Sequence, residues 1–250
     1  MTLFEKIVTT ISYLKQPAKR KMIQLAATFD DQVGLEVGGP SMFFNFKSAF
    51  PIYLHAKMID GVNFSNHTLW EGEIRQGNLY SYYKNKNGYQ FIGEASDLSD
   101  VKDGSYDFVL SCHSLEHVAN PIKALKNWHR VLRTHGRLVL VLPNKEFTFD
   151  HNRPITSLEH LMEDYNNHTT EADMTHFDEI IALHDFTFDD FVKSREDLKK
   201  RTFANIENRA VHHHVFNLDL IKELLNYCGF EMIHQQTYPP FHLVSVAQKK

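Results

Sequence analysis

The sequence predicts an α/β protein with a doubly wound, mostly parallel sheet of seven strands, helices on both faces and a histidine-rich insertion after strand five. Two observations support this fold class. Short apolar segments alternate with glycine-containing turns and amphipathic segments, as they do when each strand is followed by a crossover. The segment 138–142 is also continuously apolar, which is typical of a parallel strand buried on both faces.

The first third of the chain contains two expected strands. Residues 2–28 predict one or two amphipathic helices, because apolar residues recur at helical spacing. Residues 33–37 form an apolar strand that runs directly into two glycines, the usual entrance to a βα unit. Residues 51–60 predict a second strand that ends at Asp60. The polar and aromatic segment 61–88 is expected to be a long loop or a small excursion.

The rest of the chain predicts the other five strands. Asn217 is a plausible N-cap and Gly229 a C-terminal stop for the last helix. Between residues 145 and 215 the regular pattern breaks, and eight of the sixteen histidines lie there. The remaining expected elements are strands at 89–92, 106–111, 137–142, 230–233 and 241–247, and helices at 121–132 and 217–229.

Composition narrows the class of protein. A chain of 250 residues suits one large domain. A net charge of -4 disfavours nucleic acid as a partner. The two cysteines form no CxxC pair, which favours a reducing compartment. The N-terminus lacks the apolar core of a signal peptide, and no window approaches the roughly 18 apolar residues of a membrane span. We therefore expect a cytoplasmic protein that acts on small molecules.

Two blocks of sequence carry a family resemblance. GLEVGGPS (34–41) resembles the first motif of class I, Rossmann-like methyltransferases that depend on S-adenosylmethionine. SYDFVLSCHSLEHVANP and the residues up to 143 resemble the block from the fourth to the fifth strand, with Thr134 and His135 in place of the usual Pro and Gly. Sequences of a bacterial subgroup of the methyltransferase type 11 family contain stretches that are similar to four in this chain: NFS…TLWEG, TFDHNRP, SLEH and HHHVF.

The resemblance implies a single methyltransferase domain over residues 1–250. In it, helices at 1–28 precede a cofactor-binding half at 30–145. The insertion at 145–215 forms the acceptor site, and 216–250 supplies the last helix and two strands. It also implies S-adenosyl-L-methionine as the cofactor. The implied cofactor-binding residues are Glu36, Gly38, Gly39, Pro40, Asp60, Glu94, Ala95, Asp97 and Ser111.

Physical reasons support several of these roles. Glycines at 38 and 39 let the backbone approach a bulky cofactor, whose carboxylate can meet backbone N–H groups at the start of the next helix. Asp60 is placed to accept hydrogen bonds from ribose hydroxyls, and Glu36 holds either the turn or the amino group. The alternatives are a tight turn without ligand, a loop cap at Asp60 and ordinary turn chemistry at Glu94. A nicotinamide enzyme is disfavoured, because GGPSMF lacks the G-x-G-x-x-G spacing.

Histidines are the candidates for catalysis, because a hydroxyl acceptor must lose a proton near neutral pH. His113 follows the fourth strand, and Asp150 and His151 follow the fifth. His113→Ala or His151→Ala is expected to keep cofactor affinity and to lose turnover. His117 reads more readily as a packing residue, and Cys112 as an inert buried thiol.

The insertion supplies candidate substrate-binding residues. Arg153 could clamp a phosphate or carboxylate of the acceptor. His160, His213 and His214 could line the acceptor pocket, bind a divalent metal, or be solvated or structurally satisfied. Their spacing matches no named zinc motif, so no metal site is assigned.

The functional hypothesis is methyl transfer to oxygen or nitrogen of a small polar acceptor. The subgroup resemblance suggests a sugar or sugar nucleotide in surface-glycan tailoring. The alternative is a non-catalytic Rossmann-like binding module that partners a glycan-assembly enzyme. Acceptor, metal use and oligomeric state stay open.

Overall fold

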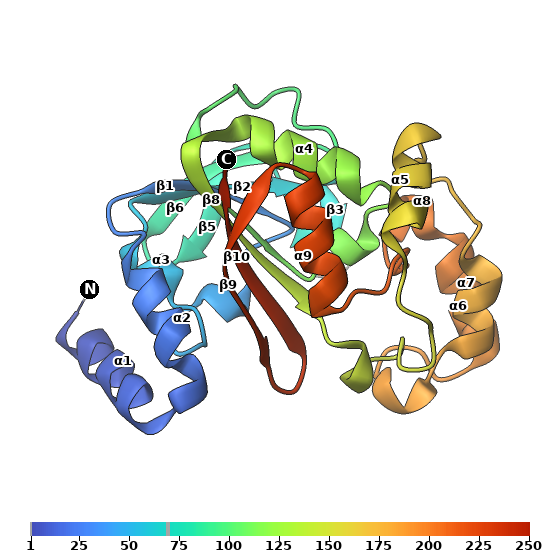
Figure 1. Ribbon diagram of the computed structural model, residues 1–250, viewed down its shortest axis with the longest axis horizontal. Coiled ribbons are helices and arrows are strands. Elements are labelled where there is room, and N and C mark those ends of the chain that lie inside the picture. The colour runs from blue at the N-terminus through green and yellow to red at the C-terminus, as the bar shows by residue number, and fades with distance from the viewer. Residues whose placement is uncertain (1, 69–70) are drawn as a thin grey trace.

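A computed structural model describes residues 2–68 and 71–250. Leu69 and Trp70, which belong to the TLWEG stretch, lie outside the described residues. Figure 1 shows a central sheet with helices on its faces and a group of helices beside it. No helix among the described residues is long and apolar enough to cross a membrane.

The main sheet has eight strands among the described residues, in the order β5-β6-β2-β1-β7-β8-β10-β9. The pairs that join β6, β2, β1, β7 and β8 are parallel, whereas β5 and β10 run antiparallel to their neighbours. The strands are β1 (Val33–Val37), β2 (Met58–Asn63), β3 (His67–Thr68), β4 (Gly72–Glu73), β5 (Gly77–Tyr83), β6 (Lys86–Ile92), β7 (Tyr106–Cys112), β8 (Leu132–Pro143), β9 (Phe230–Tyr238) and β10 (His242–Lys249).

The α/β class with a mostly parallel sheet is confirmed, but the expected number of seven strands is wrong. The extra strand is β5, which lies within the segment 61–88 that was expected to be a long loop or a small excursion. β5 and β6 form an antiparallel ribbon there, and β3 pairs with β4 in a second, small sheet. The aromatic residues of β5 pack on the main sheet, with Tyr80 and Tyr82 both buried.

Nine α-helices and four 3₁₀-helices occur in the described part of the chain. They are α1 (Leu3–Lys15), α2 (Pro17–Ala27), α3 (Ile52–His55), α4 (Pro121–Val131), α5 (Leu158–Asn166), α6 (Phe177–Leu183), α7 (Arg195–Phe203), α8 (Asn205–Asn208) and α9 (Leu218–Tyr227), with η1 (Met42–Phe44), η2 (Leu115–His117), η3 (Lys145–Phe147) and η4 (Phe186–Phe188). The cap expected at Asn217 is present, because its side chain accepts the N–H of Leu220.

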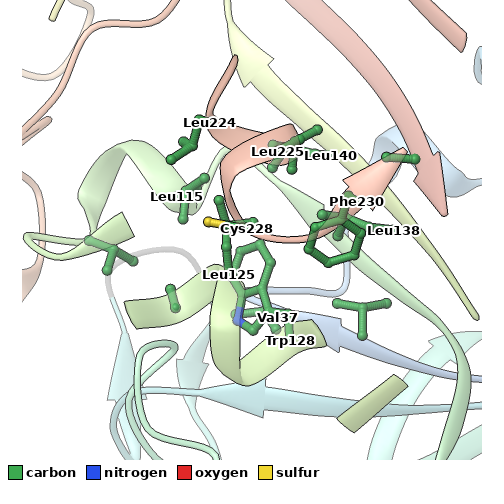
Figure 2. Packing of buried hydrophobic residues seen from close by; sticks show 14 of the residues in the cluster. Val37, Leu115, Leu125, Trp128, Leu138, Leu140, Leu224, Leu225, Cys228 and Phe230 are labelled. Carbon is green, nitrogen blue, oxygen red and sulfur yellow. The ribbon is translucent and has the colours of Figure 1, made fainter. Parts of the chain in front are cut away.

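Helices cover both faces of the sheet. On one face, α4 and α9 pack together on β8, where Figure 2 shows Trp128 beside the Leu224–Phe230 region. On the other face, α2 and α3 enclose an aromatic cluster that includes Phe29, Phe50 and Phe108. Strand β8 contributes alternate residues to the two cores, Leu138 and Leu140 to the first and Val139 and Val141 to the second. Its uninterrupted apolar sequence therefore reflects burial on both faces.

The crossover from β1 to β2 differs most from the expectation. No long helix follows β1; the described chain there contains only η1 and the four-residue α3. Residues 51–55 therefore start a helix rather than the second strand. β2 also continues past Asp60 to Asn63, because Val37 at the end of β1 pairs with Val62. The edge of the sheet thus lies three residues beyond the position that the sequence suggests.

Candidate functional site

A cavity opens at the carboxyl ends of β1, β2, β6 and β7. This is the edge at which open α/β sheets bind ligands. Phe64, Thr68 and Glu71 and the segments around 171 and 208 complete its walls. The lining residues are Val37, Gly38, Val62, Asn63, Phe64, Thr68, Glu71, Gly93, Glu94, Ala95, His113, Ser114, His117, Val118, Glu171, Asn208 and Arg209.

The turn after β1 forms one wall of this cavity. Gly38 has φ +77° and its N–H donates to the carbonyl of Val62 at 2.9 Å. A Cβ at this position would lie 2.1 Å from Oγ of Ser114, which in turn donates to the carbonyl of Val37. Both the positive φ and the close approach of Ser114 require glycine.

The side chain of Glu36 stabilises this turn through hydrogen bonds. Its carboxylate accepts hydrogen bonds from the hydroxyls of Tyr53 and Tyr80, each at 2.7 Å, and from the N–H of Ser41 at 2.9 Å. Burial raises the pKa of Glu36 to about 7, although these donors lower it. Gly39 packs directly on this cluster, because its Cβ would fall 2.3 Å from the Glu36 carboxyl carbon and the Tyr80 hydroxyl. The structure therefore assigns Glu36 to the turn.

Asp60, the expected ribose ligand, lies away from the cavity. Its carboxylate accepts the N–H of Tyr89 at 2.7 Å and the hydroxyl of Tyr106 at 2.7 Å. Asn63 stands at the end of β2 instead and lines the cavity. Its side-chain amide donates to the carbonyl of Gly39 at 3.0 Å. Asp60 thus has structural partners, and the residue of β2 that lines the cavity is Asn63, three positions later.

The turn after β6 supplies two of the expected residues. Glu94 and Ala95 both line the cavity, and Glu94 forms an ion pair with Arg209 at 2.5 Å. Asp97 instead accepts the N–H of Ser99 and stabilises the turn. Ser111 is fully buried within β7, and Pro40 lies in a shallower neighbouring depression together with Gly39. The cavity thus receives Gly38, Glu94 and Ala95 from the expected cofactor residues.

His113 and His117 lie side by side on the cavity wall that follows β7. His113 has φ +52°, and its Nε2 lies 2.9 Å from Nδ1 of His242. Burial lowers the pKa of His113 to about 3, with a further contribution from His242. Its imidazole is therefore neutral near pH 7. His117, interpreted from sequence as a packing residue, also faces the cavity.

Asp150 and Arg153 form a buried structural pair. The guanidinium of Arg153 donates to Asp150 at 2.8 Å, to Glu179 at 2.8 Å and to the carbonyls of His212 and His213. Although burial opposes ionisation, the neighbouring His212 and Arg153 lower the pKa of Asp150 to about 2. Arg153 is 2% exposed, so it cannot clamp an acceptor as the sequence suggested.

The other predicted residues of the insertion also lie outside the lining. His151 is close to Glu146, with 3.7 Å between Nδ1 and Oε2. His160 lies 2.9 Å from His176 between their Nε2 atoms, and His214 pairs with Asp164 at 3.0 Å. His213 lies 3.2 Å from the side-chain amide of Asn205.

The sequence reasoning missed several lining residues that come from distant segments. Asn63 could have been found from the turn residues that follow it, because N-F-S-N at 63–66 marks the end of a strand. Glu71, Glu171 and Arg209 belong to irregular segments, and no periodicity points to them. They reach the cavity only through the tertiary fold.

The charged side chains that line the cavity fit a zwitterionic ligand that also carries a sulfonium. Three carboxyl groups, Glu71, Glu94 and Glu171, line the cavity together with the guanidinium of Arg209. Burial raises the pKa of Glu171 to about 7 and also raises that of Glu71. A largely buried carboxylate such as that of Glu171 is stabilised by a nearby positive charge, which the amino and sulfonium groups of S-adenosylmethionine would supply.

Comparison with known proteins gives one family match. Residues 57–140 match a family model described as a methyltransferase domain. The matched segment runs from β2 through β6, β7 and α4 into β8, and so contains three of the four strand ends at the cavity. No curated protein is similar to the chain at a significant level.

Solved structures share the fold over nearly the full length. An S-adenosylmethionine-dependent methyltransferase from Mesorhizobium loti has a TM-score of 0.53 and 13% identity, and the match covers 93% of this chain and 96% of that chain. A putative S-adenosylmethionine-dependent methyltransferase from Listeria monocytogenes has a TM-score of 0.52 and 14% identity, with the same coverage. At these identities the likeness shows the fold alone.

Proposed function

We propose that this chain is a class I methyltransferase that uses S-adenosylmethionine, and we propose an acceptor class and a site for it; the match of residues 57–140 to a methyltransferase-domain model supports this. The acceptor is a small polar molecule that is methylated on oxygen or nitrogen. One observation carries the proposal: a single cavity joins the glycine turn at Gly38 to the imidazoles of His113 and His117. Cofactor and acceptor would therefore share one cavity.

The two ends of the cavity have different roles. Gly38, Asn63, Glu94 and Ala95 would hold the cofactor, because they lie at the strand ends that bind ligands in this architecture. When bound, S-adenosylmethionine supplies an activated methyl group whose carbon–sulfur bond breaks as the bond to the acceptor forms, leaving the electron pair on sulfur. The protein mainly has to align the acceptor with that methyl group.

His113 is the proposed base for a hydroxyl acceptor. Burial lowers its pKa to about 3, so the imidazole is neutral near pH 7; for the ring to act as a base, the bound cofactor and acceptor would have to raise this pKa toward neutrality. The hydrogen bond to His242 orients the ring. In methylation of a hydroxyl, the proton of the acceptor would pass to His113 as the oxygen–carbon bond forms.

The segment 145–215 is proposed to supply the acceptor side. Glu171, Asn208 and Arg209 reach the cavity from this segment and offer both charges and an amide. Polar side chains of this type suit hydroxyl groups, so a sugar or sugar nucleotide is the preferred acceptor. The role in surface-glycan tailoring rests on the sequence resemblance. Because the cysteines are free, we place the reaction in the cytoplasm.

The test is turnover by the full chain with a panel of sugars and nucleoside diphosphate sugars, followed by release of S-adenosylhomocysteine. His113→Ala should reduce turnover by about a hundredfold or more, the usual contribution of a general base, while cofactor affinity is kept. His151→Ala is the matched control, since that side chain lies outside the cavity lining, and it should leave turnover unchanged. Loss of turnover in His151→Ala alone would contradict the assignment.

A further inference from the structure

Glu116 is a buried carboxyl group next to the cavity. It belongs to η2, directly before the cavity-lining His117, and its side chain is fully buried. Among the residues that the structure describes, neither of its carboxyl oxygens has a hydrogen-bond partner. Its ion-pair neighbour is Nδ1 of His113, which is 4.0 Å from Oε1 and thus beyond hydrogen-bond distance. A buried carboxylate without a partner is costly, which indicates that a ligand completes this group.

Two imidazoles face the same point. Glu116, His117 and His212 each offer a ligand atom, and these atoms lie within 4.8 Å of one another. The rings of His117 and His212 meet edge to face, with centroids 4.6 Å apart. The N–H of His213 donates to the carbonyl of Glu116 at 2.8 Å, so the backbone of the second segment is fixed against η2. One cation could therefore be bound by residues from two distant segments.

In both imidazoles, the nitrogen that would not bind the ion makes the contact that is typical of a metal-bound histidine. Nδ1 of His117 lies 3.1 Å from the carbonyl of Val211, which can only accept, so this nitrogen carries the proton. Nδ1 of His212 faces the carboxylate of Asp150. In each ring the lone pair is then on Nε2. Metal-bound histidines typically donate their second nitrogen to a backbone carbonyl or a carboxylate in this way.

The ion pairs around Glu116 also favour a cation at its carboxylate. Asp150 already has Arg153 as its partner at 2.8 Å, and Arg153 also pairs with Glu179. The negative charge of an ionised Glu116 has no such compensation.

We propose that Glu116, His117 and His212 bind a divalent transition metal ion, with zinc and manganese as the best candidates, at the wall of the methyl-transfer cavity. Two imidazoles and one carboxylate form a three-ligand set that leaves a coordination position for a further oxygen. Because His117 lines the cavity, the proposed site adjoins the space for the acceptor. This inference rests on the proposed function: the acceptor would be a hydroxyl or carboxylate compound whose oxygen binds the ion. A metal-bound hydroxyl also loses its proton more readily, and His113 lies outside the ligand set, next to it.

A second histidine cluster, formed by His160, His176 and His214, is less suited to this role. Its groups already bind one another, with His160 and His176 2.9 Å apart and His214 bonded to Asp164 at 3.0 Å. Asp164 also accepts from the hydroxyl of Thr169. None of the three is a lining residue of the cavity. This cluster therefore provides the matched control.

The test measures metal binding by the full chain after it has been stripped with a chelator. Zn²⁺ and Mn²⁺ are titrated alone by calorimetry, and Co²⁺ is added to record the visible absorption of a bound ion. The native chain should bind one ion, and Glu116→Gln should lower the affinity by on the order of a hundredfold or more. Gln keeps the shape of the side chain and removes its buried charge, so this variant should fold. His176→Ala should bind the ion as the native chain does.

Binding of S-adenosylhomocysteine is measured in parallel on the same samples. Loss of metal binding in Glu116→Gln with the nucleoside still bound supports the proposal. Absence of metal binding in the native chain, or its loss in His176→Ala but not in Glu116→Gln, overturns the metal site and leaves the proposed function intact. Failure of the native chain to bind S-adenosylhomocysteine would instead count against the proposed function.

Discussion

Asp60 and Asn63 lie three residues apart on β2, and their surroundings decide their roles. The carboxylate of Asp60 is bound by Tyr89 and Tyr106 inside the sheet, whereas Asn63 is at the strand end and faces the cavity. Sequence alone favoured Asp60, because an acidic residue after an apolar strand is typical of a ribose ligand. The length of β2, set by its pairing with β1, decides otherwise.

Asp60→Ala is expected to lower the free energy of unfolding and to leave the affinity of the folded chain for S-adenosylhomocysteine unchanged. The hydroxyl of Tyr106 and the N–H of Tyr89 would each lose an acceptor, at a cost of about 1–3 kcal/mol. Urea unfolding and calorimetry measure the two quantities. Asn63→Ala is the comparison and should weaken binding. If Asp60→Ala instead weakened the binding of S-adenosylhomocysteine and left the stability unchanged, Asp60 would be a ribose ligand, as the sequence suggested.

The segment 210–216 between α8 and α9 is the element that joins the insertion to the cavity. It is buried, and Arg153 fixes it by donating to the carbonyls of His212 and His213. Elements with strong local signals, such as α4, β8 and α9, could be predicted from sequence. This segment could not, because its conformation depends on a guanidinium about sixty positions earlier in the chain and not on its own periodicity.

Arg153→Met should destabilise the protein by about 3–5 kcal/mol, because it leaves the buried carboxylate of Asp150 without its guanidinium partner. The change is measured by denaturant unfolding. Arg195, exposed on α7, gives the control Arg195→Met, which should shift the free energy of unfolding by less than about 0.5 kcal/mol. Equal effects of the two substitutions would show that the Arg153 network does not stabilise the insertion.

At the scale of the molecule, the parallel sheet places four strand ends side by side and so creates the cavity. The order of strands and glycine turns was sufficient to predict this edge, and the family resemblance implied the cofactor. The opposite walls were not predictable, because Glu71, Glu171 and Arg209 arrive from irregular segments that the fold brings together. The missing helix after β1 also escaped prediction, since an aromatic cluster takes its place on that face.

The most direct test of the account is calorimetric titration of the native chain with S-adenosylhomocysteine, alongside Gly38→Ala and Gly104→Ala. Both glycines have positive φ, but a Cβ at Gly104 meets no atom of the described residues within 4 Å, whereas at Gly38 it would collide with Ser114 beside the cavity. We expect saturable binding by the native chain and by Gly104→Ala. Gly38→Ala should bind about tenfold or more weakly, since overpacking costs about 1–3 kcal/mol. No binding by the native chain, or equal affinities in the two variants, would contradict the assignment of this cavity to the cofactor.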